Sequence, residues 1–401
     1  MTSFKNCVLL ILLTIALIIV VDAAKEGRAI PSEEEKKELK KQLKAINKPA
    51  IKSFKTEHSE IFDCIDIHKQ LAFDHPLLKN HSVQLKPTTV GNNISERFGP
   101  FQLMQEGISC PDGTVIVKRI TMQNLMHAQR LKSMGLFGSR HFLTERNNTD
   151  SNGQSYLAEL CFGPRNFSGA EGYLNLWEPQ VSQDQVSLAF LAVGGGSKEN
   201  FASIAVGWMV NPSLYQNDHV HLYVSWTMNG SNRGCYDLTC PGFVQVSKNI
   251  PLGVILKPIS IYDGSQYEIR LKLQLYGTNR DWWFSFKGES IGYWPGALFK
   301  DQGLANRAKY ASWGGQTYSR NTEKTPIMGS GHWPSEGLYK AAYVNSLKVI
   351  GNKGTVMDPG LKDLKVYESN PNCYKAILVH EDKVPWLRAV YYGGPAGCIG
   401  Q

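Results

Sequence analysis

Two consecutive runs of alternating residues between positions 201 and 226 constrain the fold more than any other feature of the chain. In the first run, the bulkier face comprises Ala202, Ile204, Val206, Trp208 and Val210. The opposite, smaller face comprises Ser203, Ala205, Gly207 and Met209. In the second run, Val220, Leu222, Val224 and Trp226 alternate with His219, His221, Tyr223 and Ser225. Alternation with period two predicts β-strands. The bulky face suits a sandwich core and the small face leaves room for a ligand, although an ordinary half-buried strand fits the same pattern.

The rest of the chain also favours a mainly β fold. Strand patterns recur after residue 156, and Tyr267 to Tyr276 alternates apolar and polar residues throughout. The 401 residues include 19% charged residues, 37 glycines and 19 prolines, as in a β-rich globular chain. Many short strands with turn signals predict an antiparallel β-sandwich or barrel. The net charge is +8, but no basic stripe interleaved with aromatics is present, so we expect no nucleic-acid partner.

Residues 1–24 have the pattern of a secretory signal peptide. Lys5 precedes an apolar run from Cys7 to Val21, and Val21-Asp-Ala23 offers a small-residue cleavage site. A retained membrane anchor is the competing interpretation, but the run is short of the roughly 18 residues that a spanning helix needs. We expect an exported, soluble mature protein, either extracellular (apoplast) or vacuolar, with no membrane association after the signal is removed.

An oxidising compartment makes the cysteines informative. Without Cys7, seven cysteines remain, and an odd number leaves one unpaired or paired between chains. The predicted disulfides are Cys235–Cys240, Cys373–Cys398 and Cys64–Cys110, which leave Cys161 free. We expect neither a metal site nor another cofactor, because no Cys or His pair has ligand spacing. Five glycosylation sequons fit the same compartment: Asn80, Asn93, Asn147, Asn166 and Asn229.

The N-terminal region after the signal contains a helix and a candidate processing segment. Ser32-Glu-Glu-Glu35 has the form of a capping box and opens an amphipathic helix that ends before Pro49. A second helix-like segment covers 122–134. Residues 135–155 are polar and glycine-rich and contain Arg140 and Arg146, so they predict an exposed linker with a proteolytic site.

Ordered motifs along the chain resemble those of the plant neprosin family. The N-terminal stretch FDCIDIHKQLAFDHPLLKNHSVQLKP is similar to the neprosin activation peptide. The C-terminal part contains GAEGYLNLWEPQV, VGWMVNPSLY, GCYDLTCPGFVQ, DWWFSF, IGYWPGALF, WGGQ and MGSGHWPSEG in family order. The resemblance implies a lectin- or glucanase-like β-sandwich over 156–401, preceded by a small α+β prodomain over 25–134, a linker over 135–155 and zymogen synthesis.

The resemblance also implies an acid glutamic endopeptidase that cleaves after proline. Such chemistry needs one carboxylate as general base and a protonated one as general acid. The family glutamates correspond to Ala205 and Gln316 in this sequence, and neither side chain can carry a proton in this role. Because each general acid or base contributes about 10²–10⁴-fold, the chain is predicted to be a pseudoenzyme. Residues expected to line the substrate cleft are Ser203, Gly207, Trp208, Trp313 and Gln316.

The sequence contains candidates for other chemistry. Replacement carboxylates within or beside the motifs are Asp218, Asp237, Asp281, Glu289 and Glu336. Gly329-Ser330-Gly331 is too short for a nucleophile elbow. His219 and His221 have a spacing compatible with metal but are better explained as solvent-facing. Most tryptophans at alternating positions belong to the core, although some could line a sugar-binding surface.

Three hypotheses follow from the sequence. The first is a secreted, inactive neprosin-fold protein that binds a peptide or cell-wall ligand. The second is an active prolyl endopeptidase that uses a different carboxylate pair. The third is a lectin-like carbohydrate-binding module. We expect the protein to be a monomer, with its own prodomain as a binding partner of the sandwich domain.

Overall fold

The computed structural model of the protein describes residues 32–87, 109–133, 153–230, 233–380 and 388–398. The chain divides into two compact units, Met1–Lys44 and Ala45–Gln401. The described part of the first unit belongs to helix α2 (Glu33–Ile46). Its N-terminus is the predicted capping box, because Glu35 N donates to Ser32 Oγ at 3.1 Å and Ser32 N donates to Glu35 Oε2 at 2.7 Å.

The second unit opens with a small antiparallel sheet of order β1-β2-β3. Its strands are β1 (Ala50–Lys55), β2 (Ile61–Asp66) and β3 (Thr114–Lys118). A disulfide joins Cys64 of β2 to Cys110, just before β3. The 3-10 helices η1 (Leu71–Asp74) and η2 (Pro76–Leu78) follow β2, and helix α3 (Met122–Ser133) follows β3.

A seven-stranded antiparallel sheet has the order β17-β4-β14-β6-β7-β8-β9. Its strands are β4 (Gly153–Phe162), β6 (Val186–Gly195), β7 (Ala202–Val210), β8 (Val220–Met228), β9 (Arg233–Tyr236), β14 (Tyr310–Arg320) and β17 (Leu364–Glu368). The short helix α4 (Pro212–Tyr215) connects β7 to β8. Strand β4 begins at Gly153, within the last residues of the segment predicted to be a linker.

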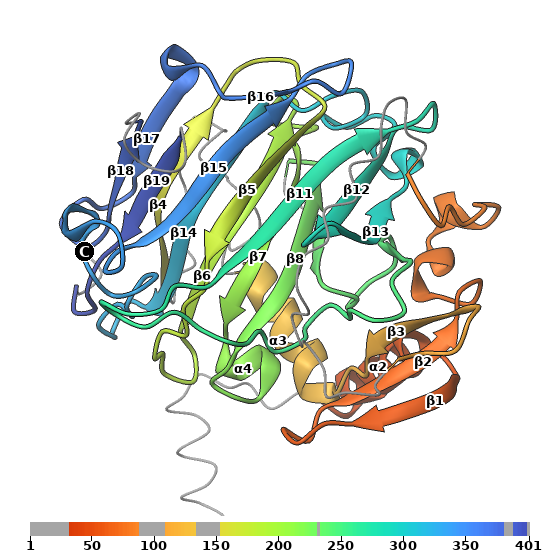
Figure 1. Cartoon of the computed structure of the whole chain (residues 1–401). Helices are drawn as coiled ribbons and strands as arrows, with labels where there is room; N and C mark the ends of the chain where they lie inside the picture. Colours follow the sequence, from red (N-terminus) through yellow and green to blue (C-terminus); the bar gives the residue numbers. More distant parts are fainter. Residues whose placement is uncertain (1–31, 88–108, 134–152, 231–232, 381–387, 399–401) are drawn as a thin grey trace, which may run out of the picture. The chain divides into compact units, whose positions relative to one another are not determined.

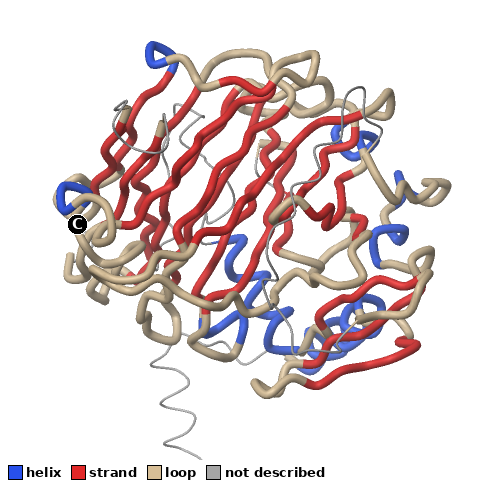
Figure 2. The backbone as a smooth tube through the Cα atoms, in the orientation of Figure 1, coloured by secondary structure: helices blue, strands red, loops and turns tan. Residues whose placement is uncertain are grey.

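The facing sheet has nine strands in the order β10-β13-β12-β11-β5-β15-β19-β18, with β16 paired to β15. They are β5 (Gly169–Asn175), β10 (Val244–Gln245), β11 (Glu268–Tyr276), β12 (Asp281–Phe286), β13 (Glu289–Trp294), β15 (Ala342–Ile350), β16 (Val356–Met357), β18 (Lys375–Val379) and β19 (Ala389–Gly393). The remaining 3-10 helices are η4 (Gly296–Phe299), η5 (Pro334–Glu336) and η6 (Leu361–Asp363). Figure 1 shows the two large sheets stacked face to face, and Figure 2 shows how strongly strands predominate, which confirms the predicted antiparallel β-sandwich.

The sandwich core forms from the bulky faces of the alternating strands. Ile204, Val206 and Trp208 of β7 lie fully buried in one apolar cluster with residues of the facing sheet. Two tryptophans of the seven-stranded sheet hydrogen-bond across the core to β5: Trp208 Nε1 donates to Asn175 O at 2.9 Å and Trp313 Nε1 donates to Glu171 O at 3.2 Å. These bonds satisfy the indole N–H groups, which would otherwise be buried without a partner at a cost of about 1–3 kcal/mol each.

The family motif Gly207-Trp208 has a steric reason. A Cβ on Gly207 would lie 1.9 Å from the carbonyl oxygen of Ala189 on the neighbouring strand β6. Only glycine therefore allows β6 and β7 to approach so closely at this point. The next residue then places its indole on the opposite, core-facing side, because side chains alternate along a strand.

Two further disulfides fix the periphery. Cys235 is joined to Cys240 after β9, and Cys373 is joined to Cys398 near the C-terminus. With Cys64–Cys110 these are the three pairs predicted from the sequence, and Cys161 on β4 belongs to none of these disulfides.

Candidate functional site

The two family glutamate positions lie on the outer face of the seven-stranded sheet, the face turned away from the sandwich core. Ala205 is on β7 and Gln316 is on β14, with β6 between them. Gln316 is opposite Leu188 on β6, whereas Ala205 is opposite Ala192. The two Cα atoms are therefore separated by two strand spacings of about 4.8 Å across the sheet and by four residues of about 3.4 Å along it. The diagonal between them is roughly 17 Å. Side chains at these positions would flank a ligand rather than contact each other.

The space between the two positions is occupied by an aromatic ring. Phe190 of β6 is midway along the diagonal from Ala205 to Gln316, opposite Gly314 on one side and Gly207 on the other. Its side chain is 3% exposed and belongs to an apolar cluster with Leu188, Ala192 and Met209. The centre of this face is therefore apolar and filled.

Both family positions are electrically neutral and buried. Ala205 is 3% exposed, and its cross-strand neighbours Ala192 and Ser225 are small. Gln316 is 4% exposed, and its Nε2 donates to Ser155 Oγ at 2.9 Å. The small-residue face predicted from the sequence exists, but it is covered and not open to solvent. Ala128 of α3 and Leu214 and Tyr215 of α4 belong to the same apolar cluster and contribute to that cover.

One carboxylate that sequence reasoning did not consider lies on this face. Glu159 of β4 is fully buried and stands directly across the ladder from Gly314 of β14. Burial, and then the negative charge of Glu159, raise the pKa of the nearby Cys161 thiol far above its ordinary range. The alternation of β4, which places Ser155, Leu157, Glu159 and Cys161 on one face, was the available signal.

The replacement carboxylates considered from the sequence do not converge on this face. Asp237 follows β9 and accepts hydrogen bonds from Val224 N and Tyr215 Oη, each at 3.0 Å. Asp281 opens β12 in the other sheet, Glu289 accepts from Ser247 Oγ at 2.6 Å, and Glu336 lies in η5 beside His332. Asp218 lies just before β8. These carboxylates are dispersed over the sandwich and define no common site.

Two of the five predicted cleft residues are placed differently by the structure. Ser203, Gly207 and Gln316 are on the outer face, as predicted, but Trp208 and Trp313 point into the core and are fully buried. Their donor bonds to β5 explain this orientation. The prediction that they line a cleft is wrong, because adjacent strand residues point to opposite faces. Trp226, Trp282, Trp283 and Trp294 are buried as well, whereas Trp333 is partly exposed.

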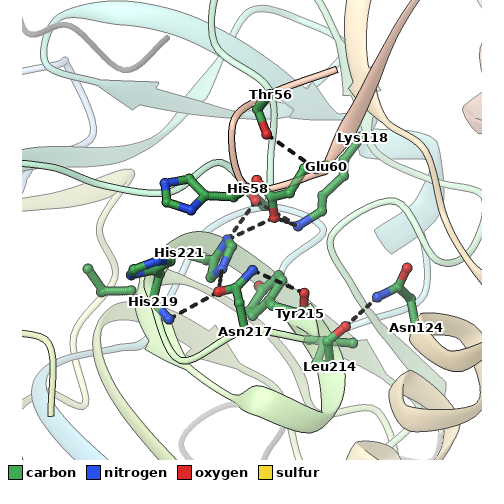
Figure 3. A network of polar contacts seen from close by, with 12 residues as sticks. Thr56, His58, Glu60, Lys118, Asn124, Leu214, Tyr215, Asn217, His219 and His221 are labelled. Carbon is green, nitrogen blue, oxygen red and sulfur yellow. Dashed lines mark hydrogen bonds and ion pairs between the residues drawn. The ribbon is translucent and has the colours of Figure 1, made fainter. Parts of the chain in front are cut away.

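A polar network connects the small N-terminal sheet to the edge of the same outer face (Figure 3). Lys118 of β3 donates from Nζ to Glu60 Oε1 at 2.5 Å, and the two side chains are only 12% and 6% exposed. Glu60 Oε1 is 3.9 Å from His221 Nδ1 on β8. The Tyr215 ring stacks on His221 with 3.9 Å between ring centroids, and Lys118 Nζ is 4.9 Å from the Tyr215 centroid. We call Glu60, Lys118, His221, Tyr215 and Asp237 the docking network.

The expectation that both histidines face solvent is wrong for His221. Its ring is fully buried, Nδ1 donates to Gly253 O at 2.8 Å, and Nε2 lies 2.8 Å from Asn217 Oδ1. Burial, and then the charge of Lys118, lower the pKa of His221 well below its ordinary value. His219 is partly exposed and lies 3.3 Å from Glu178 Oε2. No group of three metal-ligating side chains comes together within the described ranges.

Burial shifts the pKa of Asp237, another member of the docking network, in the opposite direction. It raises the pKa of Asp237 from 3.8 to about 6, although Val224 N and the Tyr215 hydroxyl favour the charged form. Asp237 and His221, whose neutral forms are both favoured by burial, therefore lie in the same network between the small sheet and the sandwich. The arrangement can respond to acidification, but it contains no nucleophile aligned with a general base.

Several predicted residues lie outside the described part of the chain. They are Arg140, Arg146, Asn93 and Asn147. Of the three described sequon asparagines, Asn80 and Asn166 are exposed and Asn229 is half-buried. No helix within the described residues is long and apolar enough to cross a membrane.

The fold defines a two-sheet antiparallel β-sandwich protein whose N-terminal region supplies a separate three-stranded sheet. Residues 183–395 match the family model described as Neprosin, and residues 53–158 match that of the Neprosin activation peptide. The chain belongs to the neprosin family, as the sequence motifs predicted.

Solved structures with a weak likeness to this chain include the following three. A scytalido-glutamic peptidase with a peptide-based transition-state analogue is 8% identical, with a TM-score of 0.33 over 61% of this chain and 99% of that one. SCP-B, a member of the Eqolisin family of peptidases, is 9% identical, with a TM-score of 0.32 over 60% and 98%. A β-porphyranase from the human gut bacterium Bacteroides plebeius is 8% identical, with a TM-score of 0.20 over 39% and 61%.

Proposed function

We propose that this protein is a secreted neprosin-fold protein without peptidase activity, whose outer sheet face binds a peptide or cell-wall ligand instead of hydrolysing it. The observation that carries the proposal is the neutral pair Ala205 and Gln316 with the Phe190 ring between them. Neither family position can exchange a proton, and the midpoint is already filled.

The loss of both groups removes most of the catalytic effect that two carboxylates supply. Each general acid or base contributes about 10²–10⁴-fold, so the pair accounts for at least about 10⁴-fold. Gln316 has the length of a glutamate side chain, but its amide cannot titrate and donates a hydrogen bond to Ser155. A binding role, unlike hydrolysis, needs no group that exchanges a proton.

Ligand access depends on the cover over this face. Because Ala205 and Gln316 are 3% and 4% exposed in the whole chain, a ligand reaches them only after covering residues leave. Helix α3, within the match to the activation peptide, supplies part of that cover. We therefore propose that the protein is made in a closed form that opens when its N-terminal segment is displaced.

A second candidate function rests on Glu159. This carboxylate shares the outer face and is opposite Gly314, two residues from Gln316 along β14. An active peptidase could use Glu159 as general base and the Gln316 amide as a hydrogen-bond donor to the developing oxyanion. No comparable observation favours the lectin-like alternative, because the strand tryptophans that could line a sugar-binding surface are buried: Trp208, Trp226, Trp282, Trp283, Trp294 and Trp313.

The deciding experiment is a peptidase assay at acid pH on a proline-containing fluorogenic peptide, after acid treatment of the whole protein. Wild type is compared with Ala205→Glu/Gln316→Glu and with Ala205→Gln, which adds the same bulk without a carboxylate. Each is also made with Phe190→Ala to open the midpoint. Circular dichroism confirms that every variant is folded.

We expect no turnover by wild type or Ala205→Gln, and a gain of at least about 10²-fold over the detection limit when both glutamates are present. Wild-type turnover that Glu159→Gln abolishes would support the second candidate instead. Wild-type turnover that persists in Glu159→Gln would contradict both the inactive protein and the peptidase that uses Glu159. No turnover by the glutamate variants that also contain Phe190→Ala would contradict the interpretation of this face as a former peptidase site.

Export is proposed from residues 1–24 and is supported by the three disulfides, which form in oxidising compartments. Expression of the full chain in a eukaryotic secretory host tests it. We expect the protein in the medium with a new N-terminus near residue 24, and cell-associated protein with an intact N-terminus would contradict the proposal.

A further inference from the structure

A hollow of about 600 Å³ lies between the N-terminal segment and the β-sandwich. One wall is formed by residues 80–82, and the other by the β11–β12 turn, η4 and residues 305–306. The volume is within the range of about 300–1,000 Å³ for small-molecule sites. The two walls belong to segments about 200 residues apart in sequence, so an occupant would contact both.

The N-terminal wall is itself a glycosylation sequon. Asn80, His81 and Ser82 all line the hollow, and Asn80 and Ser82 are exposed. His81 anchors the sequon to the sandwich, because its Nε2 is 2.8 Å from Tyr293 Oη. Three residues after His81, Gln84 N donates to the same hydroxyl at 2.9 Å. These two bonds hold the segment that contains Asn80 against the sandwich, with Asn80 among the residues that line the hollow.

The opposite wall is rich in hydrogen-bond donors. Arg280 and Lys300 are exposed, and the Arg280 guanidinium donates from Nη1 to Asn306 O at 3.2 Å. Asn279 and Asn306 add two amides. The carboxylate in the lining, Asp281, is already engaged by Gly296 N at 2.8 Å and Gln84 Nε2 at 2.5 Å. Such a wall suits a neutral polyhydroxylated ligand, whose hydroxyl and acetamido oxygens accept from guanidinium, ammonium and amide donors.

We propose that Asn80 is N-glycosylated and that the first sugars of its glycan occupy this hollow and brace the N-terminal segment against the sandwich. The Asn80 Nδ2 forms a bond to the anomeric carbon of N-acetylglucosamine and loses one proton. A polyprenyl diphosphate, the leaving group of the lipid-linked donor, departs from that carbon. The inference rests on the proposed export, since the donor and its transferase act in the secretory pathway.

A tethered sugar needs little affinity to fill the site. The linkage keeps its effective concentration in the millimolar range, so a few hydrogen bonds to Arg280, Lys300 and the amides suffice. Of the other described sequons, Asn166 is exposed but does not line this hollow. The Asn166 glycan is therefore the internal control.

The test uses the full chain secreted from a glycosylating host. Intact and peptide mass spectrometry reports which asparagines are modified, and hydrogen–deuterium exchange reports the opening of residues 71–84. Asn80→Gln and Ser82→Ala each remove the sequon, and Asn166→Gln removes a distant one. Arg280→Gln/Lys300→Gln keeps the glycan and removes two donors, with Lys353→Gln/Lys362→Gln as the charge-matched control.

We expect exchange over 71–84 to accelerate about tenfold in Asn80→Gln and Ser82→Ala, the effect of one to two net hydrogen bonds. Arg280→Gln/Lys300→Gln should accelerate it similarly while Asn80 stays modified, and both controls should match wild type. An unmodified Asn80 beside modified Asn166 would overturn this inference alone, as would a modified Asn80 whose loss leaves exchange unchanged. No modified asparagine and no secreted protein would overturn the proposed export as well.

Discussion

The outer face of the seven-stranded sheet contains two regions of opposite character. Around Ala205 and Gln316 it is neutral and filled by Phe190, whereas at the β8 edge it meets the docking network with its buried Glu60–Lys118 ion pair. His221 of the network stands in the same cross-strand row as Gln316, two strands beyond Leu188. The positions of the two family glutamates therefore hold neutral side chains, with Glu159 of β4 as the neighbouring carboxyl group, whereas an ion pair is present where the N-terminal sheet contacts the sandwich.

The difference has an energetic consequence. A buried ion pair gains little over well-packed apolar residues, but removing one partner leaves an uncompensated buried charge. The Glu60–Lys118 pair consequently holds β3 to the turn before β2 within the small sheet, and Lys118 Nζ also donates to Gly253 O of the sandwich at 3.2 Å. The neutral region makes no comparable demand, so substitutions there should be tolerated far better.

The largest expected effect is the loss of Lys118. Lys118→Met keeps the length of the side chain but leaves Glu60 buried without its cation, and should lower the free energy of unfolding by about 3–5 kcal/mol. Urea denaturation measures it. The control is Lys348→Met, which breaks a 2.8 Å pair with Asp358 whose side chains are 30% and 32% exposed and should cost at most about 1 kcal/mol. Equal costs for the two variants would contradict the distinction between the regions.

The second prediction concerns pH. Burial raises the pKa of Asp237 to about 6, so the folded protein binds a proton that the unfolded chain binds only near pH 4. Protonated Asp237 therefore stabilises the folded state at low pH. This contribution to the free energy of unfolding, on the order of 3 kcal/mol, is lost as pH rises from about 4 to above 6. His221 acts oppositely: its pKa is lowered, so stability is lost as pH falls below about 6.5, where the unfolded chain protonates.

Asp237→Asn should expose this balance. Without the Asp237 titration, the free energy of unfolding should fall more steeply than in wild type as pH decreases from 7 to 4, because only the His221 effect remains in the network. Glu60 and Lys118, which face His221 from the N-terminal sheet, are unchanged in the variant. Urea denaturation at several pH values checks it, and parallel curves for the two proteins would show that Asp237 does not titrate as proposed.

Sequence patterns predicted which face of a strand each residue occupies better than they predicted which residues of other strands lie beside it. The alternation of 202–210 correctly separated the core face of β7 from the face containing Ala205, because that period is a local property of the chain. The register that places Phe190 between Ala205 and Gln316 depends on three strands from distant segments, so no local pattern contains it. The same holds for Lys118 and His221, which are brought together only by docking of the small sheet. Glu159 could have been found by extending the alternation test to 153–162.

The smallest expected effect tests the neutral region itself. Gln316→Leu removes the amide that donates to Ser155 Oγ at 2.9 Å while keeping an apolar side chain of similar size. Because a neutral hydrogen bond contributes about 0.5–1.5 kcal/mol net, the variant should lose about 1 kcal/mol, well below the cost of Lys118→Met. Ser155→Ala removes the same bond from its other end, and a double-mutant cycle should give a coupling of similar size. A loss near 4 kcal/mol would instead mean that Gln316 supports more than this single bond, and that the family position has kept a structural role after its acid was replaced.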